Sequence, residues 1–279
     1  MIRILLSLSY ADTLDDIRLT AMKDWNGRPY TSESSRFLAY EQVSKQLGAA
    51  ITTPILPANT LGIWGFELGL HQSFSFIDTQ KSLDNTPSAW ALLTPDEDLF
   101  PILVHPKIIA RKGLPLSTEL ELSMGYLLLS RQGTIGGALR IAPFEGNHIT
   151  PDLAVQIGYH TYISSPELSL STFDTSLIIS KKFGFGYLTQ LVTAHAIPFF
   201  SIGTATTSVA PKISIEQQDV LNVSPMSGFS ASPYYNENLS NLFINTGLRL
   251  QNQEYSFQVD YRYTMSTLST FSLSMNWRY

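Results

Sequence analysis

The sequence predicts an all-β fold: a transmembrane, antiparallel, up-and-down β-barrel or barrel-like wall of about twelve strands, preceded by one short helix. Three observations favour this fold class. Large apolar residues alternate with small or polar residues through most of the chain after residue 49. Several alternating segments run past ten residues, whereas soluble strands usually have about 5–6 residues and membrane-spanning strands need about 9–11. Charged residues make up only 15% of the chain, against about 25% in soluble domains.

The bulk composition excludes several classes of function. The 279 residues carry a formal net charge of −5, which argues against a nucleic-acid surface because such a surface needs a basic patch. The absence of cysteine excludes disulfides and thiolate metal sites. No run of 18 apolar residues occurs, so the sequence contains no transmembrane helix and strands remain the other way to cross a bilayer.

The first 48 residues predict a processed segment and a helix. Residues 1–11, MIRILLSLSYA, resemble the remnant of a secretory signal peptide with Asp12 as first mature residue, although an N-terminal strand is the alternative. Residues 31–48 open with Ser and Thr caps, close on Gly48 and carry a narrow apolar stripe, which predicts a surface helix. We therefore divide the chain into a possible signal remnant (1–11), a periplasmic segment with the helix (12–48) and an outer-membrane barrel (49–279).

The period-two alternation continues from residue 49 to the last residue. A short helical turn is predicted at PSAWALL, residues 87–93. The predicted strands are 49–56, 62–77, 102–112, 116–129, 134–142, 152–162, 168–181, 185–196, 199–208, 242–251, 255–265 and 269–279.

Two assignments of the buried face compete. In a soluble sandwich the apolar face packs inward, whereas in an outer-membrane barrel it faces lipid and the polar face lines the lumen. Charges of both signs on the polar faces and aromatic residues at strand ends favour the membrane barrel. We therefore expect Leu122 and Met124 to face lipid. The candidates for the lumen are Glu67, Glu119, Glu121, Arg140, Asp260 and Arg262.

The chain ends within a strand pattern, FSLSMNWRY. This ending is similar to the aromatic signal that outer-membrane assembly machinery reads, with tyrosine in place of the more usual phenylalanine. A soluble protein whose last strand ends the chain is the alternative. The residues of this predicted assembly signal are Phe271, Leu273, Met275, Trp277 and Tyr279.

The interpretation as a membrane barrel also predicts which connections between strands lie at the same end of the barrel. If the last strand ends in the periplasm, the long connection 209–241 lies outside the cell. Counting back through the predicted strands puts the short connections near 130–133, 163–167 and 252–254 in the periplasm. The same count puts 78–101 in the periplasm, although this connection is longer than periplasmic turns usually are.

The stretches TLGIWGFELGL (60–70) and KGLP (112–115), with the aromatic C-terminus, resemble the PopA family of porin-like outer-membrane proteins from predatory bacteria. The resemblance implies an oligomeric ring of subunits around a chamber that encloses lipid. It implies no catalytic residues.

No catalytic or metal-binding pattern stands out. Phosphate-loop, nucleophile-elbow and HEXXH motifs are absent, and the five histidines lack metal spacing. His71 shares its face with Ser73 and Glu67, and His160 could meet Ser or Asp on a neighbouring strand, but scattered lumen groups are the plainer interpretation. We expect the pair Glu119 and Glu121 to be neutralised by Lys107 and Arg111 on the preceding strand.

The predicted function is therefore that of a non-enzymatic, porin-like structural or diffusion protein of the bacterial outer membrane. Expected partners are membrane lipid, further copies of the chain and the assembly machinery, without a cofactor, metal or nucleic acid. Two alternatives stay open. One is a monomeric closed barrel that serves as a small-solute channel or lipid enzyme, and the other is a secreted soluble β-protein.

Overall fold

The computed structural model describes residues 35–79, 88–93, 100–128, 130–146, 150–163, 168–185, 194–211, 237–265 and 268–279. It contains an eleven-stranded antiparallel sheet with the order β6-β5-β4-β3-β2-β1-β11-β10-β9-β8-β7. The strands are β1 (Phe66–Phe76), β2 (Ile102–Leu114), β3 (Thr118–Leu127), β4 (Gln132–Phe144), β5 (Asp152–Ile163), β6 (Leu168–Ser180), β7 (Phe183–Phe185), β8 (Ala194–Pro211), β9 (Glu237–Gln251), β10 (Tyr255–Thr264) and β11 (Leu268–Arg278).

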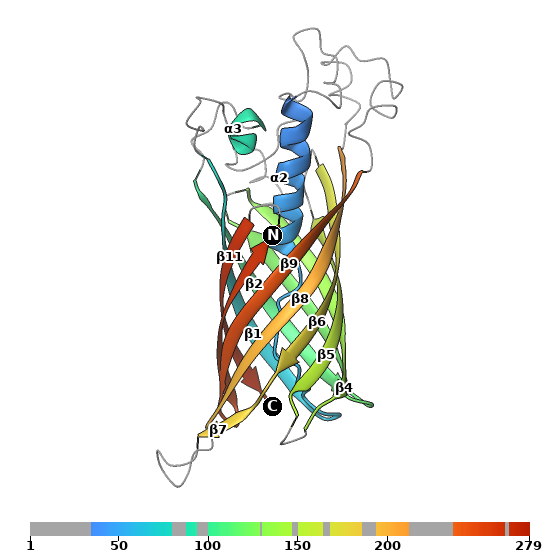
Figure 1. Cartoon of the computed structure of the whole chain (residues 1–279), viewed down its shortest axis with the longest axis vertical. Coiled ribbons are helices and arrows are strands. Elements are labelled where there is room, and N and C mark those ends of the chain that lie inside the picture. Colours follow the sequence, from blue (N-terminus) through green and yellow to red (C-terminus); the bar gives the residue numbers. More distant parts are fainter. Residues whose placement is uncertain are drawn as a thin grey trace, which may run out of the picture.

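The sheet closes on itself as a barrel (Figure 1). β6 pairs with β8 from Leu168–Pro211 to Ser180–Phe199, which joins the two sides of the sheet. The three residues of β7 pair with β8 beyond this seam. Ten strands therefore form the closed wall and β7 extends one end. The predicted all-β antiparallel barrel is confirmed, and the count of about twelve strands is slightly too high.

The alternation read from the sequence separates the two faces of the wall. In β3, Glu119, Glu121 and Ser123 are buried, whereas Leu122 and Met124 are 60% and 62% exposed. In β11, Ser272, Ser274 and Asn276 are buried and Met275 and Trp277 are exposed. The same pattern continues around the barrel, so a broad apolar surface covers its outside. A soluble monomer rarely exposes apolar surface on this scale, whereas lipid would cover it.

Two substitutions of the same kind at different depths test this outer face. Leu122→Arg should lower the free energy of folding into bilayers by about 2–4 kcal/mol, because Leu122 lies near the middle of β3. Leu116→Arg should cost about 0–1 kcal/mol, since Leu116 lies in the turn after β2 near the interface. Folding titrations into lipid vesicles measure both values. Equal costs at the two positions would contradict a lipid-facing wall.

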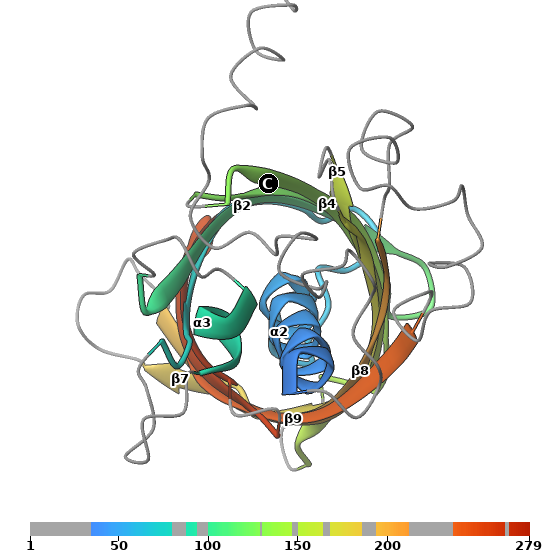
Figure 2. The ribbon, with the colours of Figure 1, turned by 90° about the horizontal axis from the view of Figure 1, so that it is seen from above.

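Two helices accompany the barrel (Figure 2). Helix α2 (Ser35–Ile51) lies inside the ring of strands, and the short α3 (Ala89–Leu93) lies beside it within the connection between β1 and β2. α3 confirms the predicted helical turn at 87–93. α2 corrects the predicted surface helix, because Tyr40 and Val43 are fully buried. Neither described helix is long and apolar enough to span a membrane.

The segment 49–56 is a second correction. It was predicted as the first strand, but α2 continues to Ile51 and the chain then runs extended through the lumen to β1. A short apolar run has the same signature in a buried strand and in any other fully enclosed segment. The predicted periplasmic segment 12–48 is described only from residue 35, and residues 1–11 lie outside the described residues.

The predicted turn at 196–199 is a third correction. β8 runs without a break through Pro198, which pairs with Leu248 of β9 while the partner on the other side changes from β7 to β6. Successive strands run in opposite directions, so one turn that does not exist moves every earlier connection to the wrong end of the barrel. The connections 76–102, 127–132 and 163–168 therefore share the end of 211–237, opposite the C-terminus. Of the four connections predicted to lie at the C-terminal end, only 251–255 does so.

The first and last strands of the chain are neighbours in the wall. β1 pairs with β11 from Glu67–Arg278 to Phe76–Ser269. Two further backbone hydrogen bonds, Phe66 N to Tyr279 O (3.1 Å) and Tyr279 N to Phe66 O (2.8 Å), close this seam. In the predicted assembly signal, Phe271 and Leu273 are half-buried on the outer face, and Met275, Trp277 and Tyr279 are exposed there.

Candidate functional site in the barrel lumen

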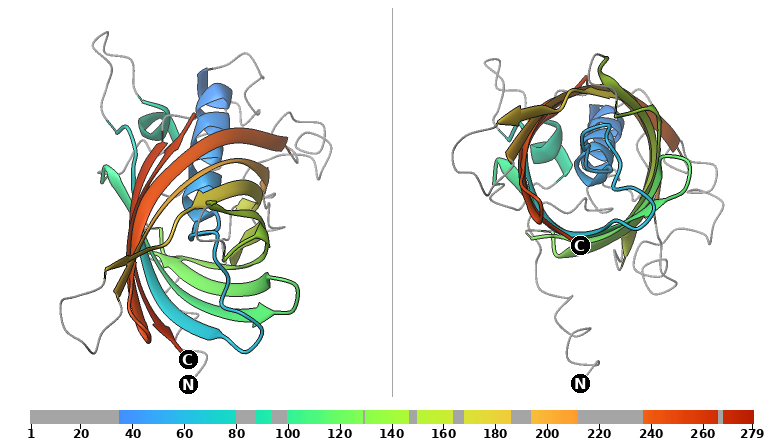
Figure 3. Two further views of the ribbon diagram at one scale, coloured as in Figure 1. Left: turned by 60° about the horizontal axis from the view of Figure 1, so that its bottom comes forward. Right: turned by 90° about the horizontal axis from the view of Figure 1, so that it is seen from below.

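The lumen is occupied by the chain itself. We define the plug as residues 35–61, which comprise α2 and the extended segment 52–61 (Figures 2 and 3). Every residue from 46 to 58 is buried, so burial along this stretch shows neither the helical nor the strand periodicity. The wall thus surrounds this stretch on all sides.

The upper half of the plug packs against apolar wall residues. Tyr40, Val43 and Leu47 of α2 belong to one buried cluster with Trp90 of α3, whose indole Nε1 donates to Gln46 Oε1 at 2.6 Å. Burial of this surface stabilises the helix inside the ring. The wall residues of the cluster are Leu103, Leu127, Leu168, Leu170, Val209, Leu239 and Leu268.

Helix α2 ends in mid-lumen with all four of its last carbonyls hydrogen-bonded. A helix leaves these four groups without partners of its own, and a buried end must supply them. Lys107 Nζ lies at the C-terminal end of α2, where a positive charge interacts favourably with the helix dipole. The bonds are Thr172 Oγ1 to Gly48 O (3.3 Å), Thr52 Oγ1 to Ala49 O (2.8 Å), His105 Nδ1 to Ala50 O (3.3 Å) and Lys107 Nζ to Ile51 O (3.1 Å).

Below the helix, wall side chains hydrogen-bond the main chain of the extended segment. Pro54 and Pro57 have no N–H group, so a helix could not continue through them and the carbonyls of Ala50 and Thr53, four residues earlier, need other donors. Donors come from strands β2, β4, β5 and β10. The bonds are Lys107 Nζ to Thr52 O (2.7 Å), Arg262 Nη2 to Thr53 O (2.7 Å), Gln156 Nε2 to Pro54 O (3.1 Å), Gln258 Nε2 to Ile55 O (2.7 Å) and Arg140 Nη1 to Pro57 O (2.8 Å).

Wall oxygens in turn accept from the amide groups of the same segment. Thr53 N donates to Asp174 Oδ2 at 3.2 Å, and Ala58 N donates to Ser180 Oγ at 3.0 Å. Further down, Thr60 N donates to Glu145 Oε2 (2.7 Å) and Leu61 N to Glu119 Oε1 (2.5 Å). The segment is therefore held by both kinds of backbone group along its length.

Thr53 also makes side-chain contacts with two wall strands. Its hydroxyl donates to Asp174 Oδ2 of β6 (2.9 Å) and accepts from His160 Nε2 of β5 (2.9 Å). Gly158 provides the space, since a Cβ there would lie 1.8 Å from Thr53 Oγ1. The extended segment thus approaches β5 too closely for any side chain at residue 158.

Buried ion pairs connect five wall strands in the lower lumen. Arg111 bonds Glu67 at 2.7 Å and Glu119 at 2.5 Å. Arg140 also bonds Glu119, and Arg249 reaches Glu67 from β9. We call these five residues the ion chain: Arg249, Glu67, Arg111, Glu119 and Arg140. Each is at most 6% exposed, so the pairing is what makes their burial tolerable.

All six lumen candidates from the sequence are buried. Glu67, Glu119 and Arg140 belong to the ion chain. Glu121 lies 4.0 Å from Arg111 Nε, and Asp260 accepts from Asn245 Nδ2 (3.0 Å) and Gln258 Nε2 (3.0 Å). Arg262 bonds the Thr52 hydroxyl as well as Thr53 O, and lies 4.9 Å from the Phe243 ring centroid.

The sequence singled out Arg140, Arg262 and Glu119, which bind the plug, but it did not predict that role. Arg111 pairs with Glu119 as expected, but Lys107 binds plug carbonyls instead of the glutamates. Gln156, Gln258 and Arg249 were not singled out. All lie on the polar face of alternating strands, which was the available signal, but no pattern shows that a segment so far away in the chain fills the space beside them.

The histidines considered for catalysis serve as lumen hydrogen-bonding groups. His71 Nδ1 lies 2.7 Å from Ser274 Oγ of β11, whereas Glu67 on its own face is engaged by arginines. His160 binds the plug through Thr53. Both imidazoles are buried. His71 and Ser274 are among the residues around a groove in the outer wall, but both side chains are buried, and within the described residues no carboxylate is hydrogen-bonded to His71 to complete a catalytic group.

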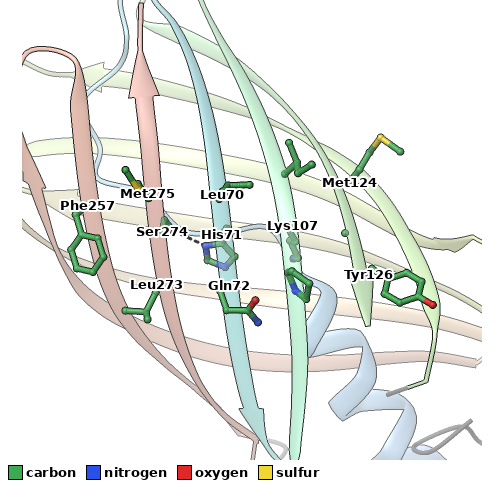
Figure 4. A pocket seen from close by; sticks show the side chains of 13 residues that line it. Leu70, His71, Gln72, Lys107, Met124, Tyr126, Phe257, Leu273, Ser274 and Met275 are labelled. Atoms are coloured by element: carbon green, nitrogen blue, oxygen red, sulfur yellow. Dashed lines mark hydrogen bonds between the residues drawn. The ribbon is translucent and has the colours of Figure 1, made fainter. Parts of the chain in front are cut away.

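Two cavities adjoin this region. One is a groove of about 620 Å³ on the outer wall, lined by Leu70, Gln72, Met124, Phe257 and Met275, while His71 points from the same strand towards Ser274 (Figure 4). The other, about 810 Å³, lies where the plug leaves the lumen, and its lining includes Thr60, Leu61, Glu145, Lys182 and Arg278. Arg278 Nη2 donates to Thr60 O at 3.3 Å.

A closed β-barrel with an apolar outside and a polar, charged inside defines the structural class of this protein. Comparison adds only fold similarity: no protein-family model and no curated protein matches the chain. Three solved structures of porin-like outer-membrane barrels are similar to this chain, with TM-scores of 0.33 or less. Similarity at this level does not show a shared function. The PopA resemblance therefore stays an expectation.

These three structures illustrate the similarity. The KdgM porin in complex with disordered oligogalacturonate is 6% identical and covers 76% of this chain and 98% of its own, with TM-score 0.33. The N-terminal β-barrel domain of Pseudomonas aeruginosa OprF is 11% identical, covering 78% and 99%, with TM-score 0.31. Neisserial surface protein A is 8% identical, covering 76% and 95%, with TM-score 0.31.

Proposed function

We propose that the protein is a porin-like β-barrel of the bacterial outer membrane whose lumen is closed by its own plug. The exposed apolar wall supports insertion into lipid. The polar inner face resembles the lining of an aqueous channel, but it is used to bind residues 46–61. The unbroken burial of residues 46–58 is the observation that carries the proposal. Small solutes pass only when the plug is displaced.

A reversible lock tests this closure. The chain has no cysteine, so Ala58→Cys with Ser180→Cys allows one defined disulfide between the plug and β6, where the amide of Ala58 lies 3.0 Å from Ser180 Oγ. In planar bilayers, urea below the unfolding concentration should open wild-type channels and leave the oxidised double variant silent. Reduction should restore opening, and Ser180→Cys alone should resemble wild type in either state. Steady channel current from the oxidised protein would contradict closure by the plug.

We propose that the aromatic C-terminus directs assembly into the outer membrane. Deleting residues 277–279 removes Trp277, Tyr279 and the two hydrogen bonds that Tyr279 makes with Phe66. The amount of folded, heat-modifiable protein in the outer-membrane fraction should fall strongly. A conservative Tyr279→Phe variant, which keeps the aromatic ring and the backbone bonds, should assemble normally. Undiminished assembly of the deletion variant would remove the proposed role.

An oligomeric ring that encloses lipid is a second proposal, resting on the family resemblance. The wall closes within one chain, so its hydrogen bonding requires no partner. The outer groove beside Leu70, Phe257 and Met275 offers a concave apolar surface for lipid or a neighbouring copy. Native mass spectrometry after gentle extraction gives the subunit number and the bound lipid. A monomer that loses all lipid on detergent exchange would refute the ring.

A further inference from the structure

In addition to forming the strands of the wall, the chain runs once through the lumen, as the plug. β1 begins and β11 ends at the same end of the wall, because Glu67 pairs with Arg278. The extended segment reaches that end from inside the lumen, whereas α2 begins at the opposite end (Figures 1 and 3). Ser35 and Tyr279 therefore lie at opposite ends of a closed barrel. Whatever precedes Ser35 in the chain is attached at the end away from the C-terminus.

The wall recognises the extended part of the plug mainly through atoms that every residue shares. Eight carbonyl groups between residues 50 and 60 accept hydrogen bonds, and wall side chains of the described strands supply all eight, two of them from Lys107. Within this extended part, the side chains that contact the wall include the hydroxyls of Thr52, Thr53 and Thr60 and a small apolar cluster around Ile55 and Ala58. Such a lining suits an extended polypeptide more than a sugar or an ion.

This lining also answers a physical difficulty of moving a polypeptide across a membrane. A peptide carbonyl or amide without a hydrogen-bond partner is costly to bury away from water. Lys107, Arg262, Gln156, Gln258 and Arg140 provide donors at successive depths, from the middle of the lumen to its lower mouth. An extended chain in this lumen can therefore keep most of its carbonyl groups paired.

We propose that the lumen is a binding track for the main chain of an extended polypeptide, through which the protein carries its own N-terminal segment to the opposite face of the membrane from its C-terminus. The inference rests on the membrane-spanning part of the proposed function. It goes further in assigning the lumen a polypeptide as its ligand and the two termini opposite sides of the bilayer.

The topology is tested in the full-length chain with single cysteines. Ser35→Cys reports the start of α2, and Glu254→Cys reports the exposed turn between β9 and β10 at the C-terminal end. Intact cells are treated with a membrane-impermeant maleimide before and after permeabilisation of the outer membrane. One cysteine should react at once and the other only after permeabilisation. Reaction of both under the same condition in membrane-bound protein overturns the inference, whereas recovery in the soluble fraction would instead overturn the membrane function.

The binding track is tested by removing two donors. Ala58→Cys places a thiol on a fully buried plug residue, and its rate of maleimide modification reports release of the segment. Adding Gln156→Leu and Gln258→Leu removes the bonds to Pro54 O and Ile55 O, and should raise this rate about tenfold or more. Thr270→Val is the matched control, because its hydroxyl bonds Ser75 within the wall. Equal protection in the double leucine variant and the control would overturn recognition of the backbone.

Discussion

Gly158→Leu is expected to expel the plug and open the lumen. A Cβ at this position would lie 1.8 Å from Thr53 Oγ1 and 2.9 Å from both carboxylate oxygens of Asp174, so a leucine cannot share the space with the extended segment. β5 is hydrogen-bonded to strands on both sides and cannot retreat without breaking its pairing. Overpacking of about 1–3 kcal/mol corresponds to about a 5- to 150-fold shift between closed and open states.

Single-channel recording in planar bilayers measures the effect as a rise in open probability over wild type. Gly133→Leu is the control: this glycine lies on the same barrel, but its nearest neighbour to an added Cβ is Ile163 O at 3.5 Å. The control should keep wild-type currents. If Gly158→Leu folds normally and is as silent as Gly133→Leu, the plug does not determine whether the lumen conducts.

Arg111→Met is expected to cause the largest loss of stability among the wall residues considered. Arg111 is the centre of the ion chain and neutralises parts of Glu67, Glu119 and Glu121 at once. Without it, three buried carboxylates face only Arg140 and Arg249 within the group. Leaving a buried charge without its partner costs about 3–5 kcal/mol, and the free energy of unfolding from lipid vesicles in urea should fall by that amount.

The neighbouring Lys112→Met provides the control. Lys112 is exposed near the end of β2, and in the part of the chain that the structure describes its ammonium group donates to Trp64 O at 3.3 Å. Its loss should change the free energy of unfolding by less than about 1 kcal/mol. Adding Glu121→Gln to Arg111→Met should recover part of the stability, because one of the excess carboxylates is then neutral. A loss in Arg111→Met no greater than that in Lys112→Met would show that the ion chain does not stabilise the wall.

The plug supplies hydrogen-bond partners for many polar groups on the inner face of the wall. A barrel of this size with a polar inner face needs either water or protein to satisfy its buried groups. Here the plug satisfies many of them, including donors of Lys107, Gln156 and Gln258. Stability and closure are therefore coupled, because displacement of the plug leaves these wall groups to be solvated by whatever enters the lumen.

Most of the wall follows from local patterns in the sequence. Alternation with period two is a local property, and it predicted most of the observed strands. It also placed Glu67, Glu119 and Arg140 on the polar face of their strands, and these side chains are buried. It also gave the position of α2 along the chain and the helical turn at α3. Each of these features depends on residues within one or two turns or strands of each other, so a linear pattern contains the necessary information.

What fills the barrel, and which connections share an end, depends on contacts between residues far apart in the chain. Residues 46–58 are enclosed on every side, so they show no periodicity that separates a strand from a threaded segment. The partners of Thr53 lie 107 and 121 residues away, on β5 and β6, and no local pattern specifies such contacts. The continuity of β8 through Pro198 depends on its pairing with β9, and that long-range pairing fixes the end at which every earlier connection lies.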